Sequence, residues 1–515
     1  MIKLKINNTE IAVPEGTSVL KALRSAGFNV PALCWNDELE HINSCMLCLV
    51  KDHSSGKLFP SCSARVQEGM AILTEDEEIR EARQTGLELL LSEHVGDCEA
   101  PCQLGCPAHM NIPGMNRLIA AGKFEESLRL VKRDIALPSV LGRICPAPCE
   151  GVCHRRTVDE PVSICTLKRF VGDMNDVHPW PVPPLNGKRV AIIGSGPAGL
   201  AAAYYLRLAG VEPTIYDMND KPGGQLRTAI SADVLPPEVL DREIQSILDT
   251  GVRFVGNTPV GDDCCSRFKE EYDAIVVATG NLNDLTKSFQ LQGTPKGLQV
   301  NEKTYETSEE GIFAVGNVIR PSRLAIRSLG QGKEVAFSVT QYLEGRPVTG
   351  EPRLFNSRFG KLMQSEFAEY LKESHPGKRN YPDHTEDGFL PQKAMEEATR
   401  CLHCDCRAID DCQLRKWSDH YHAIQKRFQT TPRRAITKHF QTDHVVYEPQ
   451  KCIKCGICVK LTEKHSEEFG MTYIGRGFDV VIGIPYNENL NQALQKIAIK
   501  VARACPTGAI EERKK

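Results

Sequence analysis

The stretch that decides how this chain is organised reads HVGDCEAPCQLGCPAHMNIPG over residues 94–114 and, after a helical pattern, CPAPCEGVCHRRTVDEPVSICTLKRF over residues 145–170. It holds seven cysteines: Cys98, Cys102, Cys106, Cys145, Cys149, Cys153 and Cys165. Three of them precede the helical pattern and four follow it, so neither half has enough thiolates to complete two four-ligand iron–sulfur sites. The two halves are therefore expected to fold together around metal.

Length and composition limit what such a stretch can mean. A chain of 515 residues is expected to form several domains of α/β type, and its formal net charge of −3 gives no reason to expect nucleic acid or an anionic membrane as a partner. No apolar run is long enough to predict membrane insertion, and the start, MIKLKINNTEIAVPEG, alternates like a strand and not like a signal peptide. The 21 cysteines gather in C-x2-C and C-P runs, which favours metal over disulfides. We therefore expect a metal-binding protein of the cytoplasm.

Residues 1–78 show alternating strands, a short helical segment and four cysteines on loops: Cys34, Cys45, Cys48 and Cys62. Four thiolates around two irons make a [2Fe–2S] site. A four-cysteine zinc site is the alternative, although zinc sites usually contain two C-x2-C pairs and only one is present. The four positions resemble the amino-terminal domain of the large iron–sulfur subunit of respiratory NADH dehydrogenase and of iron-only hydrogenases, which implies a β-grasp [2Fe–2S] domain. The resemblance continues into LELLLSEHVGDC, where those families carry a histidine followed by a cysteine.

From Cys98 onward, APCQLGCP, LGRICPAPCEGVC and VDEPVSICTLKRF resemble the amino-terminal helical domain of the glutamate synthase small subunit and of dihydropyrimidine dehydrogenase. This resemblance implies a helical domain with two [4Fe–4S] clusters over residues 79–180. The interleaved pattern of those families places one cluster on Cys106, Cys145, Cys149 and Cys165. It places the other on Cys98, Cys102 and Cys153, with His94 as the expected fourth ligand. The alternatives are a solvent-exposed His94, ligation by His154, or a cluster with an open iron.

A proline-rich linker, HPWPVPPLN, precedes a domain expected over residues 188–348. The run KRVAIIGSGPAGLAAAYYLRLAG is typical of strand, turn and helix, with Gly194, Gly196 and Gly199 in the G-x-G-x-x-G frame of dinucleotide-binding folds. Asp217 closes the next strand, where an acid can bind ribose hydroxyls. The motifs KPGGQL, YDAIVVATG and EEGIFAVGNV follow in order and add the remaining expected cofactor contacts: Gly224, Gln225, Leu226, Gly280, Gly316 and Asn317.

These pieces resemble the FAD domain of the glutamate synthase small subunit, which implies a Rossmann-like fold that binds FAD. In that family an NADPH-binding domain is inserted between the ATG strand and the closing glycine motif. Here about thirty residues separate Gly280 from Gly311, too few for a second βαβ fold, so this chain is expected to bind no NAD(P)H. Asn317 stands where the family usually has an aspartate beside the flavin ribityl and phosphate groups. Cys264 and Cys265 lie outside any C-x2-C frame and are expected to be bystanders.

Residues 349–430 are expected to form an extension with one [4Fe–4S] cluster. The run CLHCDCRAIDDC supplies its four cysteines: Cys401, Cys404, Cys406 and Cys412. A zinc knuckle is the alternative, because CLHC also offers His403. Multicluster relatives place similar runs after the FAD domain, which favours iron.

Residues 431–515 carry the ligands of a single ferredoxin cluster: Cys452, Cys455, Cys458 and Cys505. Two-cluster ferredoxins place a second set of ligands in register with these, and here those positions hold Thr462, Gln495, Ala498 and Val501. All four ligands of one cluster are missing while all four of the other remain. The pattern predicts a ferredoxin-like domain that keeps one [4Fe–4S] cluster, and the sequence between its halves again resembles the NADH dehydrogenase and hydrogenase subunits.

Together these assignments give one [2Fe–2S] and four [4Fe–4S] sites, an array that moves single electrons. The sequence shows no GK[ST] phosphate loop and no HExxH motif. We therefore expect an electron-transfer subunit of a larger soluble oxidoreductase, a hetero-oligomer of anaerobic metabolism. Resemblance implies partners of hydrogenase, formate dehydrogenase or aldehyde oxidoreductase type, together with an NAD(P)H-binding or ferredoxin-type partner. The alternatives are a self-contained ferredoxin-dependent flavoenzyme that reduces a small substrate at FAD, and a zinc-stapled interaction scaffold.

Overall fold

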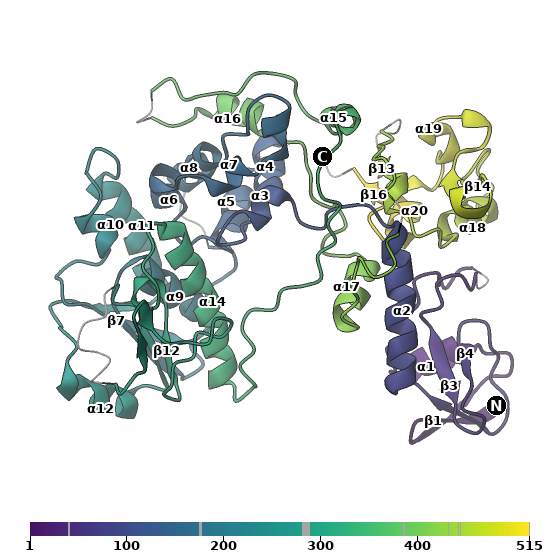
Figure 1. Cartoon of the computed structure of the whole chain (residues 1–515), viewed down its shortest axis with the longest axis horizontal. Coiled ribbons are helices and arrows are strands. Elements are labelled where there is room, and N and C mark those ends of the chain that lie inside the picture. The colour runs from purple at the N-terminus through teal and green to yellow at the C-terminus, as the bar shows by residue number, and fades with distance from the viewer. Residues whose placement is uncertain are drawn as a thin grey trace. The chain divides into compact units, whose positions relative to one another are not determined.

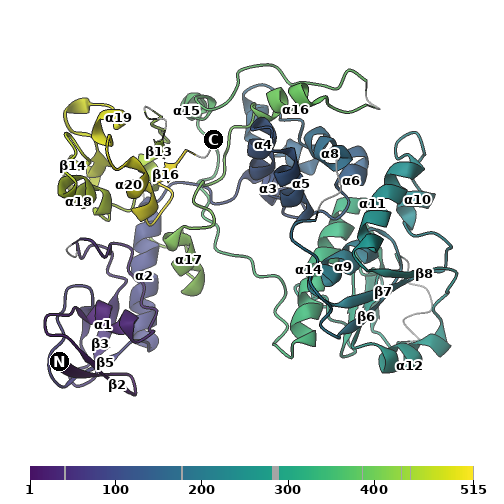
Figure 2. The ribbon, with the colours of Figure 1, turned by 180° about the vertical axis from the view of Figure 1, so that it is seen from behind.

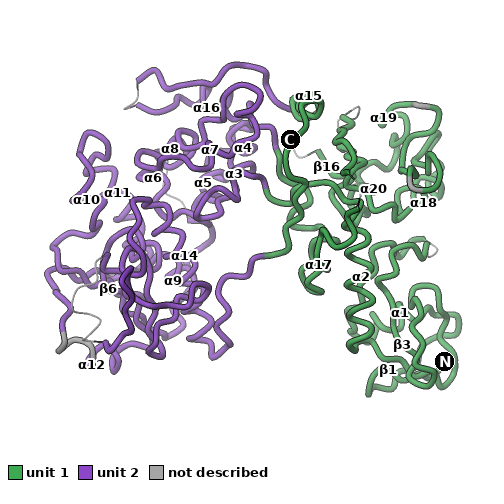
Figure 3. Tube along the Cα trace, in the orientation of Figure 1, with its two compact units in different colours: residues 1–99, 354–372, 404–515 green, residues 100–353, 373–403 purple. Residues whose placement is uncertain are grey.

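A computed structural model describes residues 1–39, 42–174, 178–280, 289–384, 387–430, 432–440, 442 and 444–513. The side chains of residues 262–265, 478 and 487 lie outside the described part, and with them the expectation that Cys264 and Cys265 are bystanders. The chain forms two compact units, coloured separately in Figure 3. Unit 1 contains Met1–Glu99, Leu354–Lys372 and Cys404–Lys515, and unit 2 contains Ala100–Arg353 and Glu373–His403. The expected extension 349–430 is therefore divided between the units.

Unit 1 begins with a five-stranded mixed sheet in the order β2-β1-β5-β3-β4 (Figure 1). Its elements are β1 (Ile2–Ile6), β2 (Thr9–Val13), α1 (Val19–Ser25), β3 (Leu49–Asp52), β4 (Leu58–Pro60) and β5 (Met70–Leu73). Strand β1 pairs antiparallel with β2 and parallel with β5. The alternation of its sequence buries Leu4 and Ile6 and exposes Lys3 and Lys5, so that α1 packs over one apolar face.

Helix α2 (Glu77–Glu93) connects this sheet to His94, which is the carboxyl-terminal cap of the helix. The Asp76 side chain caps its amino terminus by accepting a hydrogen bond from the Ile79 amide at 2.8 Å. Arg83 lies in the middle of the helix, only 1% exposed, and donates to the carbonyl oxygens of Leu49 and Thr74. These bonds fix α2 against the amino-terminal sheet and so fix the starting point of the loop that carries Cys98.

The remainder of unit 1 is built from two short β pairs and small helices (Figures 1 and 2). Strand β13 (Val445–Tyr447) pairs antiparallel with β16 (Ile510–Glu512), and β14 (Thr472–Ile474) pairs with β15 (Val481–Gly483). The α-helices are α15 (Phe367–Leu371), α17 (Gln413–His420), α18 (Ile457–Lys464), α19 (Leu490–Ala493) and α20 (Ala498–Ala504). Single 3-10 turns cover Gln364–Glu366, Pro449–Lys451, Gly477–Asp479 and Pro485–Asn487.

Unit 2 contains a five-stranded parallel sheet in the order β12-β9-β6-β7-β8. The strands are β6 (Arg189–Ile193), β7 (Glu212–Tyr216), β8 (Arg253–Val255), β9 (Ala274–Val277) and β12 (Ile312–Ala314). Its helices are α9 (Pro197–Leu208), α10 (Gln225–Thr228), α11 (Pro237–Asp249), α12 (Asp262–Glu271) and α14 (Ala325–Leu343). Minor elements are β10 (Gly293–Thr294), β11 (Gly297–Leu298) and the 3-10 turn Gly316–Val318. The expectation of a multidomain α/β chain with a parallel Rossmann-like sheet is confirmed.

A cluster of short helices precedes this sheet in unit 2: α3 (Pro101–Leu104), α4 (Ile112–Ala120), α5 (Phe124–Lys132), α6 (Pro138–Ile144), α7 (Pro148–Gly151), a 3-10 turn (His154–Thr157) and α8 (Ile164–Met174). Helix α16 (Pro391–Ala398) joins them from far along the sequence and packs on α4. Within the described ranges, no helix is both long and apolar enough to cross a bilayer.

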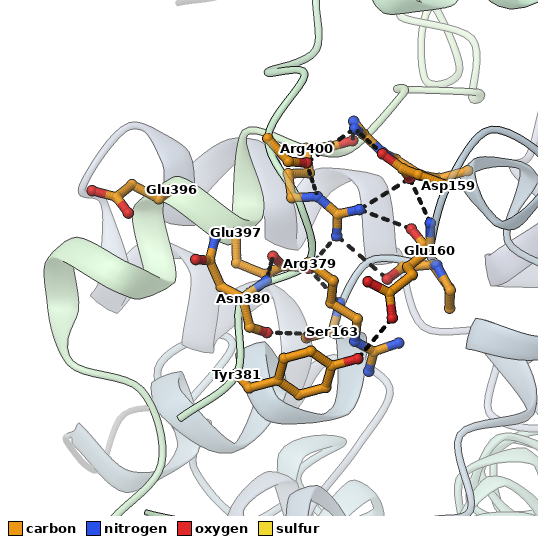
Figure 4. Close-up of polar contacts among 12 residues, drawn as sticks. Asp159, Glu160, Ser163, Arg379, Asn380, Tyr381, Glu396, Glu397 and Arg400 are labelled. Carbon is orange, nitrogen blue, oxygen red and sulfur yellow. Dashed lines mark hydrogen bonds and ion pairs between the residues drawn. The ribbon is translucent and has the colours of Figure 1, made fainter. Parts of the chain in front are cut away.

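Buried charges hold the segment with α16 in place (Figure 4). Glu397 and Arg400 are fully buried and pair at 2.8 Å. The Glu397 carboxylate also accepts from the Ser163 amide, and Arg400 donates to the Glu160 carbonyl oxygen. Because a buried charge without partners is costly, this network specifies how the segment sits on the helices. It also brings Cys401, which follows Arg400, to the helical part of unit 2.

Candidate metal centres and nucleotide cavity

Four thiols of the amino-terminal domain lie together. Cys34, Cys45, Cys48 and Cys62 are all buried. Hydrogen bonds from the thiols of Cys45 and Cys62 lower the pKa of Cys34, and a hydrogen bond with Cys62 lowers the pKa of Cys48 to about 7. The same contacts raise the pKa values of Cys45 and Cys62, so they show that each of the four thiols lies within hydrogen-bonding distance of another. The donor set fits the [2Fe–2S] site expected from the sequence.

A second group of thiols surrounds a buried lysine in the helical part of unit 2. The thiols of Cys145 and Cys149 both contact the Cys165 thiol. Burial raises the pKa of Cys106, and the nearby Cys145 thiolate raises it further. The Lys168 Nζ lies 3.8 Å from the Cys165 sulfur. Burial alone would lower the pKa of Lys168, but the four neighbouring thiolates outweigh burial and raise it. The structure thus brings together the four residues assigned to one [4Fe–4S] cluster.

Replacing Lys168 with methionine is expected to make the reduction potential of this cluster more negative by on the order of 100 mV, equivalent to about 2 kcal/mol for one electron. A buried cation stabilises the added negative charge of the reduced state. Redox titration followed by electron paramagnetic resonance measures the shift, and Lys168→Arg, which keeps the charge, should retain most of the original potential. An unchanged potential in Lys168→Met would show that the lysine does not face the cluster.

A third group lies between β13, α18 and α20. Cys452, Cys455, Cys458 and Cys505 line one small cavity together with apolar side chains of Ile453, Ile457, Ile482 and Ile510. Burial raises the pKa of Cys452 to about 12, and the nearby Cys505 thiolate adds to the shift. The Lys454 amide donates to the Cys452 sulfur at 3.3 Å. An apolar cavity with four inward thiols and an amide donor fits a [4Fe–4S] cluster.

Three of the four positions at which a second ferredoxin cluster would bind, namely Thr462, Ala498 and Val501, are buried in packed structure. Ala498 and Val501 lie in the apolar core with Leu461 and Leu490. The Thr462 hydroxyl is also buried, donating to the Val459 carbonyl oxygen and accepting from the Met471 amide. Side chains therefore occupy the volume that a second cluster would need.

Shortening Val501 to alanine is expected to destabilise this domain by about 2 kcal/mol, because it leaves a cavity in a packed core. Iron content should stay unchanged, since Val501 binds no cluster. Hydrogen exchange of the α20 amides measures the loss, and exposed Gln495→Ala should change it by less than about 0.5 kcal/mol. Loss of iron from Val501→Ala would contradict the assignment of this position to packing alone.

The other assigned ligands are distributed over the two units. His94, Cys98, Cys404, Cys406 and Cys412 belong to unit 1, whereas Cys102, Cys153 and Cys401 belong to unit 2. Neither the expected set His94, Cys98, Cys102 and Cys153 nor the expected set Cys401, Cys404, Cys406 and Cys412 is contained in a single unit. The sequence patterns of these loops could not reveal that division.

His94 is buried, with 8% of its surface exposed, so the alternative of a solvent-exposed histidine is wrong. Its Nδ1 lies 2.9 Å from the Lys451 carbonyl oxygen. Burial lowers the pKa of His94 to about 4, which keeps the ring neutral and able to bind metal. His154, the alternative to His94 as a ligand, belongs to unit 2. His403, which the CLHC run offers to a zinc knuckle, accepts a hydrogen bond at Nδ1 from Arg117 at 3.2 Å.

Among the described residues, no three or more His, Cys, Asp or Glu side chains converge as they would around one metal ion. In a [4Fe–4S] cluster each protein ligand binds a different iron atom, so its ligands do not have to converge on a single point. The sets of buried cysteines described above therefore still fit iron–sulfur clusters, whose usual protein ligands are thiolates.

A cavity of about 700 Å³ lies at the carboxyl ends of the parallel strands in unit 2. It is lined by nearly all of the expected cofactor contacts: Gly194, Gly196, Asp217, Gly224, Gln225, Leu226, Gly280, Gly316 and Asn317. Gly199 lies outside the lining and instead lets α9 pack against the turn at Gly194. Sequence reasoning missed Asn219, Thr279, Ser322 and Arg323, which also line the cavity.

The glycine turn and Asp217 are fixed by the backbone around them. Gly194 has φ +106°, and a Cβ atom there would lie 2.5 Å from the Ala278 carbonyl oxygen, so only glycine fits. Asp217 accepts hydrogen bonds from the Ser195 amide at 2.7 Å and from Asn219. Burial alone would raise the pKa of Asp217, but hydrogen bonds from the Ser195 hydroxyl, from Asn219 and from the Ser195 amide outweigh burial and lower the pKa. The carboxylate is therefore held charged at the cavity wall.

Asn317 is turned toward its own loop: its side-chain oxygen accepts from the Ser322 amide at 3.1 Å. The Gly316 amide donates to the Gln331 side chain at 2.9 Å. The size of the cavity is typical of cofactor sites, and its glycine turn at a helix amino terminus suits a pyrophosphate. The residues present therefore fit FAD.

Comparison with known families identifies three regions of the chain. Residues 1–77 match the 2Fe-2S iron-sulfur cluster binding domain, and residues 77–180 match dihydropyrimidine dehydrogenase domain II, 4Fe-4S cluster. Residues 164–332 match the pyridine nucleotide-disulphide oxidoreductase family. The resemblances seen in the sequence are confirmed for these regions.

Curated relatives match part of the chain. The NADPH-Fe(3+) oxidoreductase subunit beta of Geobacter sulfurreducens is 39% identical over 243 residues, which cover 46% of this chain and 34% of the relative. The NADP(+)-dependent formate dehydrogenase subunit beta of Moorella thermoacetica is 40% identical, covering 35% and 29%. The glutamate synthase [NADPH] small chain of Bacillus subtilis is 37% identical, covering 36% and 40%. The matched part thus spans well under half the length of each relative. The chain joins a 2Fe–2S cluster binding domain, a 4Fe–4S cluster domain and a pyridine nucleotide-disulphide oxidoreductase domain in one polypeptide.

Proposed function

We propose that this chain is an electron-transfer subunit of an oxidoreductase complex in the cytoplasm. It would hold one [2Fe–2S] cluster, four [4Fe–4S] clusters and FAD, and pass electrons between partner subunits. In this proposal residues 1–78 form a β-grasp [2Fe–2S] domain and residues 431–515 a ferredoxin-like domain. The observation that carries the proposal is that separate groups of buried thiols and a nucleotide-sized cavity occur in one chain.

The protein supplies binding, orientation and electrostatics, while the clusters and flavin supply the electron chemistry. Buried thiolates would hold each cluster, and the Lys168 ammonium, beside Cys165, Cys145, Cys149 and Cys106, would stabilise the added charge of one of them. The Lys454 amide donates to a ligand sulfur of another. The glycine turn at Gly194 and the Asp217 carboxylate orient the dinucleotide in its cavity.

The proposed role needs partners because we expect no nicotinamide domain in this chain, where about thirty residues connect Gly280 with Gly311. Among residues 289–311, the described part of the connection between Gly280 and β12, the only strands are β10 and β11, of two residues each. The relatives are named as subunits of an NADPH-Fe(3+) oxidoreductase and a formate dehydrogenase. We propose a catalytic partner of hydrogenase, formate dehydrogenase or aldehyde oxidoreductase type, and an NAD(P)H-binding or ferredoxin-type partner.

Anaerobic stopped-flow absorbance tests this function. The isolated chain should be reduced by dithionite but not by NADH or NADPH, and NAD(P)H should reduce it only after the chains that co-purify with it are added. Rapid reduction of the isolated chain by NAD(P)H would contradict the proposal. Steady turnover of the isolated chain with reduced ferredoxin and one small acceptor would instead favour a self-contained flavoenzyme.

A further inference from the structure

The loop from His94 to Cys98 runs along the 3-10 turn Pro449–Lys451 of unit 1. The Val95 amide donates to the Gln450 carbonyl oxygen at 2.8 Å, and His94 Nδ1 lies 2.9 Å from the Lys451 carbonyl oxygen. Gly96 lies against the Lys451 side chain, since a Cβ there would be 3.0 Å from the Lys451 Cε. The loop is therefore held along both the backbone and the side chain of Lys451.

Cys98, at the end of this loop, is hydrogen-bonded through its backbone to Cys406. The Cys406 amide donates to the Cys98 carbonyl oxygen at 3.0 Å, and the Ser357 amide donates to the Cys98 sulfur at 3.4 Å. Both thiols are buried, with 7% and 6% of each residue exposed. These contacts lie within unit 1 and bring together two cysteines separated by about three hundred residues.

Cys412 lies beside the same two residues. Its sulfur accepts from the Arg415 amide at 3.4 Å and lies 3.9 Å from the Pro506 carbonyl oxygen. Two residues after Pro506, Gly508 lies directly against the Cys406 sulfur, where a side chain would collide with it. Burial raises the pKa of Cys412, and the thiolates of Cys406 and Cys98 raise it further, which agrees with this proximity.

We propose that Cys98, Cys406 and Cys412 bind one [4Fe–4S] cluster with His94 Nε2 as its fourth ligand. A carbonyl oxygen only accepts hydrogen bonds, so His94 Nδ1 carries the proton toward Lys451 and Nε2 keeps its lone pair. A ligating histidine typically donates its second nitrogen to such an acceptor. This ligand set replaces the pairing of Cys98 with Cys102 and Cys153 that the sequence suggested.

The proposed site shares two segments with the carboxyl-terminal cluster site. Lys451 precedes Cys452, its Nζ pairs with buried Glu448 at 2.6 Å, and the Thr507 hydroxyl donates to its carbonyl oxygen. The other shared segment runs from Cys505 to Gly508. The two clusters would therefore be adjacent steps in the relay, a consequence that rests on the proposed function.

Iron and sulfide counts on the anaerobically isolated full chain test the ligand set. Cys98→Ser and Cys406→Ser should each lose about four irons, and the double variant should lose the same four, because both residues serve one cluster. In the matched control, Cys98→Ser combined with Cys165→Ser should lose about eight irons. Loss of about eight irons from the Cys98→Ser and Cys406→Ser pair would overturn the inference while leaving the proposed function intact. A wild-type chain without iron would overturn both.

His94→Cys provides a second test that does not depend on losing a cluster. It should keep the iron and lower the midpoint potential of one paramagnetic signal, the signal absent from Cys98→Ser and from Cys412→Ser, because a thiolate replaces an imidazole. Cys102→Ser should retain that signal. Unchanged potentials in His94→Cys, or loss of the same signal in Cys102→Ser, would overturn the assignment.

Discussion

Gly196→Val is expected to lower the flavin content of the purified chain at least about tenfold, a loss of about 1.4 kcal/mol or more in binding. Gly196 lines the nucleotide cavity at the amino terminus of α9, where the backbone must approach the pyrophosphate. Its φ of −70° suits any residue, and a Cβ there meets no atom within 4 Å. The fold should therefore survive while the added methyl groups occupy space needed by the cofactor.

Flavin absorbance and iron content of the same sample separate these effects. The control is Gly261→Val, which also places a Cβ at least 4 Å from other atoms but does not line the cavity. It should keep both flavin and iron. Full flavin content in Gly196→Val would mean that the cofactor does not cross this glycine turn, and the assignment of the cavity to FAD would be lost.

Cys455→Ser is expected to remove about four irons and one paramagnetic signal from the chain. Cys455 is 8% exposed and lies between Cys452, Cys458 and Cys505 in an apolar cavity. A neutral hydroxyl is a poor substitute for a thiolate in binding iron. The signals of the amino-terminal and helical sites should persist, because none of their ligands contributes to this cavity.

The matched control for Cys455→Ser is Cys264→Ser, a cysteine that the sequence assigns to no cluster. This variant should retain all iron and all signals. If Cys264→Ser lost as much iron as Cys455→Ser, the division of the cysteines into ligands and bystanders would be incorrect.

The sequence predicted best those features that depend on local order. The glycine turn, the acid at the end of β7 and the later glycine motifs occur in the order in which a parallel sheet brings them to one edge. The assigned FAD contacts accordingly line one cavity, apart from Gly199, whose role is packing. Cys452 and Cys505, which the sequence predicts to be ligands of one ferredoxin-like cluster, line the same cavity, and β13 pairs with β16 next to them.

The sequence could not predict which distant loops meet. Cys98 and Cys102 are one helical turn apart in sequence, yet they fall in different units, and the Cys98 carbonyl oxygen accepts a hydrogen bond from the Cys406 amide. Which cysteine lies beside Cys98 depends on the contacts of its loop with the Lys451 backbone and on the packing of α2. Neither feature is marked by a cysteine pattern in the sequence. Buried ion pairs such as Glu397 with Arg400, which hold the segment before Cys401, also leave no periodic signal in the sequence.

The central claim, that this chain carries electrons on iron–sulfur clusters and also binds a flavin, is tested most directly by elemental and cofactor analysis of the full chain isolated without oxygen. We predict about eighteen irons per chain, matching acid-labile sulfide and one FAD, with zinc at trace level. A colourless chain that contains stoichiometric zinc and no sulfide would contradict the account.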